Sequence, residues 1–83
     1  MYIDILKQLF IELFNVNHLM LDLIDKVEDT DWGDEFLVGF YAENIKEEYN
    51  EEELLKYKDE NSYSCLNNLD EEEIEEFLND IFN

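Results

Sequence analysis

The sequence of 83 residues contains no arginine and no proline, and it has only two glycines, one cysteine and one histidine. Glycine and proline are the strongest local breakers of regular structure, so their scarcity favours a helical fold. The single cysteine excludes an internal disulfide, which is typical of a reducing compartment. The start, MYIDILKQLFIELF, has no basic leader region or small-residue cleavage site and is too interrupted by charge to span a bilayer. These absences predict a soluble cytoplasmic protein.

Acidic residues dominate what is present. The chain has 24 Asp and Glu against five Lys, and its net charge of −19 far exceeds the magnitude of about 2–8 that suffices for the solubility of a small domain. Residues 1–42 hold nine acids and two lysines, and residues 43–83 hold fifteen acids and three lysines. Because 46% of the chain is hydrophobic, it is not a disordered acidic tail. The composition predicts a single folded domain, residues 1–83, that is negative throughout.

The apolar spacing of the first half predicts two helices. Residues 2–14 carry a wide apolar stripe at helical spacing, which consists of Tyr2, Ile3, Ile5, Leu6, Leu9, Phe10, Ile11, Leu13 and Phe14. The segment NVN, residues 15–17, predicts a break because Asn favours caps and turns, and one bent helix through residue 28 is the alternative. The second helix, over residues 18–28, has an expected inward face of Leu19, Met20, Leu23, Ile24 and Val27.

A turn at residues 28–35, EDTDWGDE, separates these helices from a third segment. Apolar residues at helical spacing predict a helix over residues 34–49, with Tyr41 and Tyr49 in the core. A short strand over residues 35–41 is the alternative, since Val, Phe and Tyr suit strands and Gly39 weakens a helix.

Two capping boxes predict the last two helices. Asn50 precedes a helix over residues 51–58 with Glu53 at its third position, and Asp70 precedes a final helix with Glu73 in the same place. The inward face of that final helix is expected to be Ile74, Phe77, Leu78, Ile81 and Phe82. We therefore expect an all-α fold, a compact bundle of four to five short helices.

Residues that commonly carry catalysis or metal binding are poorly placed here. His18 is the only histidine, and Cys65 in NSYSCLNN has no nearby cation to activate its thiol. The segment that begins at Asp29 resembles a calcium loop only in its acids, because Gly33 falls at its fifth position and Phe40 occupies its twelfth. We expect no enzymatic activity, no cofactor and no built metal site.

The outward face of the final helix carries an electrostatic repulsion that lowers stability and that the fold does not require. Glu71–Glu75, Glu72–Glu76 and Glu76–Asp80 are like-charged pairs one turn apart, and each costs roughly 0.2–0.5 kcal/mol. Glutamates in the first turn recover part of this at the positive end of the helix dipole. A single Glu→Lys change would relieve the rest, which suggests that the negative field is itself functional.

The candidate partner-binding residues are the acids of three segments together with one tryptophan. They are Asp31, Trp32, Asp34, Glu35, Glu47, Glu48, Glu51, Glu52, Glu71, Glu72, Glu75, Glu76 and Asp80. Carboxylates one turn apart are spaced by about 6 Å along a helix axis, which coarsely resembles the phosphate spacing of about 3.4 Å on a DNA strand. A basic groove that binds DNA would attract both, so the expected partner is a basic nucleic-acid-binding protein rather than nucleic acid or a membrane.

In size and charge, this chain, with segments such as EYNEEELLKYKDEN and LDEEEIEEFLNDIF, resembles the phage-encoded DNA-mimic inhibitors, among them anti-CRISPR proteins. The resemblance covers the whole chain but is compositional, so it assigns no individual residue. The resemblance implies a protein that acts in the host-cell cytoplasm and blocks a Cas nuclease. For a Cas9-type target, it implies that the protein occupies the basic cleft that reads the PAM duplex. Restriction enzymes, recombination nucleases, glycosylases and nucleoid proteins are equally suited as targets.

Two other classes of function fit the same features. One is an immunity protein or antitoxin that caps the basic active site of a toxin nuclease, with the same electrostatic steering. The other is a helical adaptor or homodimer, because the first helix is apolar on nearly all sides and one 83-residue chain has little surface with which to cover it.

Overall fold

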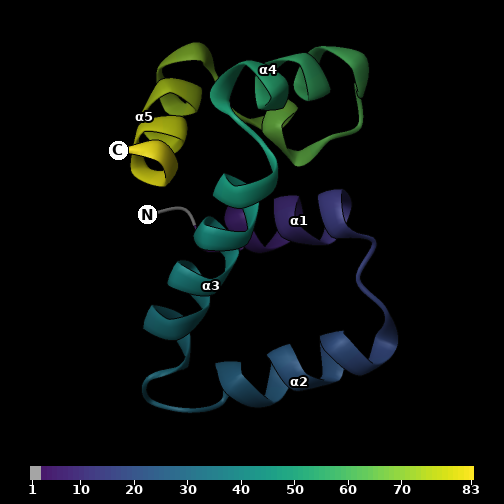
Figure 1. Cartoon of the computed structure of the whole chain (residues 1–83), viewed down its shortest axis with the longest axis vertical. Coiled ribbons are helices and arrows are strands. Elements are labelled where there is room, and N and C mark those ends of the chain that lie inside the picture. Colours follow the sequence, from purple (N-terminus) through teal and green to yellow (C-terminus); the bar gives the residue numbers. More distant parts are fainter. Residues whose placement is uncertain (1–2) are drawn as a thin grey trace.

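The computed structural model describes residues 3–83, which form five α-helices and one short 3₁₀ helix and contain no strand. The elements are α1 (Ile3–Phe14), α2 (His18–Glu28), α3 (Gly33–Glu48), α4 (Glu51–Glu60), η1 (Cys65–Asn68) and α5 (Glu71–Phe82). In Figure 1, α3 connects α2 at the lower end of the molecule with α4 and α5 at the upper end. The predicted all-α bundle of short helices is therefore confirmed.

Asparagine residues separate α1 from α2. Asn15 has a φ of 50°, a left-handed conformation that Asn tolerates better than most residues. Asn17 then caps α2, and its side-chain oxygen accepts a hydrogen bond from the Met20 backbone N–H at 2.9 Å. The predicted break at residues 15–17 is confirmed, and the alternative of one bent helix is wrong.

The segment for which a strand was the alternative lies inside α3, so a strand over residues 35–41 is wrong. Leu37, Tyr41 and Ile45 are buried and recur every four residues, so a helix places all three on one face. Gly39 is exposed on the surface of this helix. Gly33, in contrast, is required, because a Cβ there would lie 1.8 Å from the backbone oxygen of Val27.

Both predicted capping boxes are present. The Asn50 side chain accepts from the Glu53 N–H at 2.8 Å, and the Glu53 carboxylate accepts from the Asn50 N–H at 2.9 Å. Asp70 and Glu73 repeat the arrangement at the start of α5, at 2.8 and 3.2 Å. Each box satisfies two backbone donors that the helix itself leaves unpaired. The polar connection after α4 contains η1, which sequence patterning did not predict.

One hydrophobic core joins all the elements, and α3 lies at its centre with principal contacts to α1, α2 and α5. Tyr41 is 1% exposed, and its ring centre lies 5.1 Å from that of Phe10 on α1. Tyr49 is partly buried against the core, as predicted. The buried hydrophobic residues are Leu6, Leu9, Phe10, Ile24, Leu37, Tyr41, Ile45, Leu54, Cys65, Leu66, Ile74, Phe77, Leu78 and Ile81.

The apolar stripe of α1 is covered within a single chain. Leu6, Leu9 and Phe10 are buried, and the other described apolar residues of the helix are partly buried; Tyr2 lies outside the described residues. Most of the apolar surface of α1 is therefore covered within one chain, and the adaptor or dimer alternative stays a prediction.

Helix α2 is less buried than predicted. Leu19 and Leu23, expected to face inward, are 76% and 58% exposed, and Met20 is also exposed; the prediction for these three residues is wrong. Helix α2 lies at one end of the molecule and packs chiefly on α3 (Figure 1). Only one side of it is therefore covered, and Ile24 is its one buried residue, with Val27 partly buried beside it.

A hydrogen-bonded carboxylate joins α1 to the polar connection. Glu12 accepts a hydrogen bond from the Tyr57 hydroxyl at 2.9 Å and another from the Cys65 backbone N–H at 3.0 Å. Burial alone would raise the pKa of Glu12, but the hydrogen bonds that favour its charged form outweigh burial and lower the pKa. This carboxylate is therefore a structural acid, unlike the exposed acids around it.

We expect Glu12→Gln to lower the free energy of unfolding at pH 7 by about 1–2 kcal/mol, since hydrogen bonds to a charged group are worth about 1.5–3 kcal/mol. The folded-state pKa is depressed, so this stabilisation is present above the unfolded pKa and is lost as pH falls through the folded value. The stability difference between variant and wild type should therefore shrink below about pH 4. Urea denaturation followed by circular dichroism at pH 7 and at pH 3.5 measures both values.

The matched control is Glu47→Gln, which removes an exposed carboxylate near the end of α3. It should leave stability unchanged or raise it slightly by relieving repulsion. A loss for Glu47→Gln equal to that for Glu12→Gln would contradict a special role for Glu12.

Candidate interaction surface

All thirteen predicted partner-binding residues are exposed. The structure does not gather them on one face. Asp31, Trp32, Asp34 and Glu35 lie at the turn between α2 and α3 and in the first turn of α3, whereas the other nine lie near the end of α3 and on α4 and α5. Along α3 the nearest members of the two groups, Glu35 and Glu47, are 12 residues apart, about 18 Å of helix. The acids thus form two clusters at opposite ends of the molecule (Figure 1).

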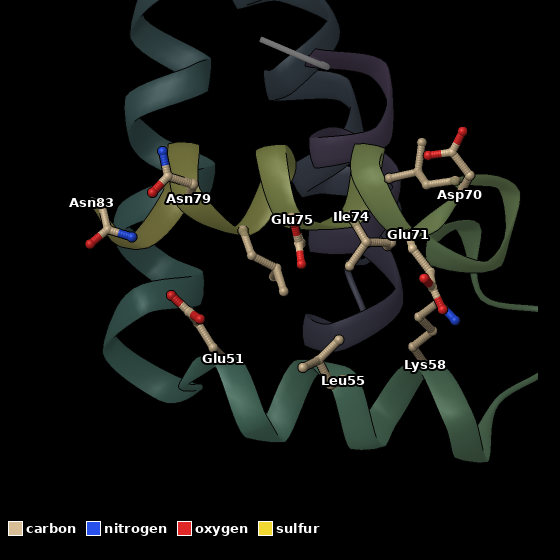
Figure 2. Close-up of a pocket in the computed structure, with 11 residues that line it drawn as sticks. Glu51, Leu55, Lys58, Asp70, Glu71, Ile74, Glu75, Asn79 and Asn83 are labelled. Carbon is tan, nitrogen blue, oxygen red and sulfur yellow. The ribbon is translucent and has the colours of Figure 1, made fainter.

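A groove between α4 and α5 lies within the larger cluster (Figure 2). Its volume is about 930 Å³, near the upper end of the range of about 300–1,000 Å³ for binding pockets. We call it the α4–α5 groove. It is lined by Glu51, Leu55, Lys58, Leu69, Asp70, Glu71, Ile74, Glu75, Leu78, Asn79 and Asn83.

The groove exists because α4 and α5 are anchored in the core independently. Helix α4 buries Leu54, while α5 buries Ile74, Phe77, Leu78 and Ile81. Leu55, the neighbour of Leu54, is left 41% exposed, and Figure 2 shows it on the side of α4 that faces the α5 residues of the groove. The groove is therefore apolar at its base.

Carboxylates surround this apolar base. Glu51 comes from α4, Asp70 is the N-cap of α5, and Glu71 and Glu75 come from α5; Lys58 is the only lysine in the lining. Three of these acids, Glu51, Glu71 and Glu75, belong to the predicted partner-binding set. The arrangement suits an occupant that is apolar in the middle and positively charged at its edges.

Sequence reasoning missed Leu55 as a functional candidate. Its signal was present, because α4 has two adjacent leucines, Leu54 and Leu55, in a short helix whose other residues are charged apart from Tyr57. Successive residues on a helix point about 100° apart, so the two side chains do not share one buried face. The second leucine therefore indicated a further apolar surface.

The acidic end of α5 has little local compensation. The first turn carries Glu71, Glu72 and Glu73 at the positive end of the helix dipole, where negative charge is favourable. The last turn holds no basic residue, and Asp80 lies at the negative end. Elsewhere in the described part of the chain, ion pairs connect Lys7 to Glu28 and Asp25, and Lys56 to Glu60.

Trp32 belongs to both a surface and a row of packed rings. It is 58% exposed, and its ring meets Phe36 edge-on with centroids 5.8 Å apart. Phe36 stacks on Phe40 at 6.1 Å, and Phe40 lies 5.4 Å from Phe10 in the core. The rings are less exposed to solvent at each step from Trp32 to Phe10. The acidic turn therefore presents an aromatic surface that packs on the core.

The described residues offer little for bond-making chemistry. In residues 3–83 no group of three or more His, Cys, Asp and Glu side chains is arranged to hold a metal ion. Cys65 is buried, and burial, with the Glu12 charge nearby, raises the pKa of its thiol to about 12. His18 is exposed at the start of α2.

Comparison with known proteins adds no relationship: no family model, curated protein or solved structure matches this chain. None of the helices in the described part of the chain combines the length and the apolar character needed to cross a membrane. The chemistry of the surface therefore has to be inferred from its own residues.

The cost of the acidic face on α5 can be measured with Asp80→Lys. This change removes repulsion from Glu76, places a glutamate four residues before a lysine, and puts a cation near the C-terminal end of the helix. We expect it to raise the free energy of unfolding by about 1 kcal/mol at low salt, from the sum of those effects. Asp80→Asn, the control, should give about half of the increase, and 1 M NaCl should reduce both. Destabilisation by Asp80→Lys would show that the negative face supports the fold.

Proposed function

We propose that this chain is an acidic DNA-mimic inhibitor that occupies the basic nucleic-acid-binding cleft of a host-defence nuclease, in the first place a CRISPR-Cas effector, and thereby blocks DNA binding. The observation that carries the proposal is the density of exposed acid, with a net charge of −19 and every predicted contact residue at the surface. Such a field attracts a basic cleft and speeds association with it.

The arrangement of the acids supports mimicry rather than general solubility. Glu72, Glu76 and Asp80 follow one another at successive turns of α5, about 6 Å apart along the axis. The longest dimension of the molecule is 33 Å, close to one turn of B-DNA, about 34–36 Å. A cleft that holds one turn of duplex therefore has the length to receive the whole molecule.

The inhibition can be tested by displacement of DNA. A guide-loaded Cas9-type effector is bound to fluorescently labelled target DNA, and fluorescence anisotropy is followed as the protein is added. Displacement should occur at low salt and weaken steeply between about 50 and 200 mM NaCl, as for other contacts that replace phosphates. A type II restriction enzyme and a toxin nuclease, assayed in parallel, identify the class of target. In a second experiment, the immobilised chain recovers proteins from a bacterial lysate, and duplex DNA is used to elute them. The proposal is overturned if duplex DNA elutes no DNA-binding protein.

Charge reversal identifies the surface that makes contact. We expect Glu72→Lys combined with Asp80→Lys to weaken displacement about tenfold, or about 1.4 kcal/mol. The control is Asp22→Lys with Asp29→Lys, two exposed acids at the other end of the molecule, which changes the net charge by the same amount. Equal weakening by both pairs would mean that total charge, and not the α5 face, determines binding.

A further inference from the structure

The α4–α5 groove has a length that matches a helix better than a small ligand. Its lining on the α5 side runs from the N-cap Asp70 to the C-terminal Asn83, a span of about 20 Å at 1.5 Å per residue. On the α4 side it runs from Glu51 to Lys58, about 10 Å, and Figure 2 shows Glu71, Ile74 and Glu75 on the side of α5 that faces this row. A small molecule would fill only part of such a groove, whereas a helix of three to four turns would follow it.

The base of the groove requires an apolar partner surface. Leu55 is 41% exposed there and Leu69 is partly buried, whereas Ile74 and Leu78 line the α5 side with only 5% and 6% of their surfaces exposed. A mimic of DNA needs only its carboxylates to contact a basic cleft, so the apolar strip between them, of which Leu55 is the exposed part, has no role in that contact. Burial of this strip would add about 25 cal/mol for each Å² removed from water.

The edges of the groove determine the charge of the occupant. Three carboxylates, on Glu51, Glu71 and Glu75, line the groove with one ammonium group, on Lys58, while the Asp70 carboxylate at its end caps α5. A second copy of this chain, at −19, would be repelled, and an apolar helix without charge would leave the carboxylates without partners. The complementary occupant carries Lys or Arg on both sides of an apolar stripe.

We propose that the α4–α5 groove binds a basic amphipathic helix of the partner protein, with apolar residues at positions i, i+4 and i+7 on Leu55, Ile74 and Leu78 and flanking Lys or Arg on the acids. This is recognition of a helix in a groove. The proposal deepens the proposed function and rests on it for the basic character of the partner. The acids then provide attraction at long range, and the groove provides specificity at contact.

Two synthetic peptides test the groove directly. The first is a 15-residue helical peptide with leucines at i, i+4, i+7 and i+11 and lysines at its polar positions. The second has the same lysines and a serine in place of each leucine. Isotope-labelled protein is titrated with each peptide and followed by NMR at 150 and 500 mM NaCl. The leucine peptide should shift the backbone amide signals of α4 and α5 around Leu55, Ile74 and Leu78, and its binding should persist at 500 mM NaCl. Binding of the serine peptide should be lost at that salt concentration.

A matched pair of variants separates the groove from exposed leucine in general. Leu55→Gln removes the exposed apolar group of the groove and keeps a good helix former, and it should weaken binding of the leucine peptide about tenfold. Leu19→Gln makes the same change at a leucine of α2 that is 76% exposed, and it should leave binding unchanged. Circular dichroism of both variants verifies that the helical content is retained.

Several outcomes would overturn the helix proposal. Equal binding of the two peptides, or equal effects of Leu55→Gln and Leu19→Gln, would show that charge alone is recognised. Amide shifts centred on Leu19 and Leu23 would place the apolar contact on α2. Displacement of the leucine peptide by monomeric dodecyltrimethylammonium at similar affinity would make the groove a small-ligand site.

The two proposals can fail separately. If the Leu55→Gln variant displaces DNA from the nuclease as well as the wild type does, the chain is an inhibitor that does not use the groove. If the leucine peptide binds in the groove but the chain competes with DNA for no target, the groove is a binding site and the chain is not a DNA mimic.

Discussion

The buried face of α3 is the interaction on which the rest of the molecule depends. Leu37, Tyr41 and Ile45 lie on that face, and α1, α2 and α5 all make their principal contacts with this one helix. The charges around them repel one another, so the apolar contacts to α3 have to exceed both the conformational entropy of the chain and that repulsion. Glu12 adds a polar link from α1 to Tyr57 and the Cys65 backbone. The core around this central helix therefore supports the acidic surface.

Local chemistry made much of the fold predictable. The Asn50 and Asp70 boxes, the asparagines between α1 and α2 and the spacing of the α5 core residues each determine their own segment, so sequence alone indicated them. Segment 35–41 was ambiguous, because Val, Phe and Tyr suit strands, and it became a helix through the shared buried face of α3. Leu19 and Leu23 were wrongly predicted to be buried. Their helical spacing shows that they share a face, but it does not show whether another element covers that face.

The site was predictable in its charge but not in its shape. Composition indicated that acids such as Glu47 and Glu72 would be exposed, since carboxylates are rarely buried without a partner. It could not indicate that α3 would separate the acids into two clusters, or that α4 and α5 would enclose a groove over Leu55. Those features depend on the angles between helices, which are determined by packing among distant residues. Glu71 and Glu75 therefore border an apolar surface as well as contributing to the negative electrostatic field.

Gly33 imposes a different kind of constraint on the surface beside it. The Val27 carbonyl lies where any side chain at this position would begin, so substitution would force the end of α2 away from α3. The neighbouring Asp31, Asp34 and Glu35 are exposed and have no such restriction. The acids of this turn can therefore be substituted while the corner that carries them keeps its shape. The turn can acquire new contacts without a new fold.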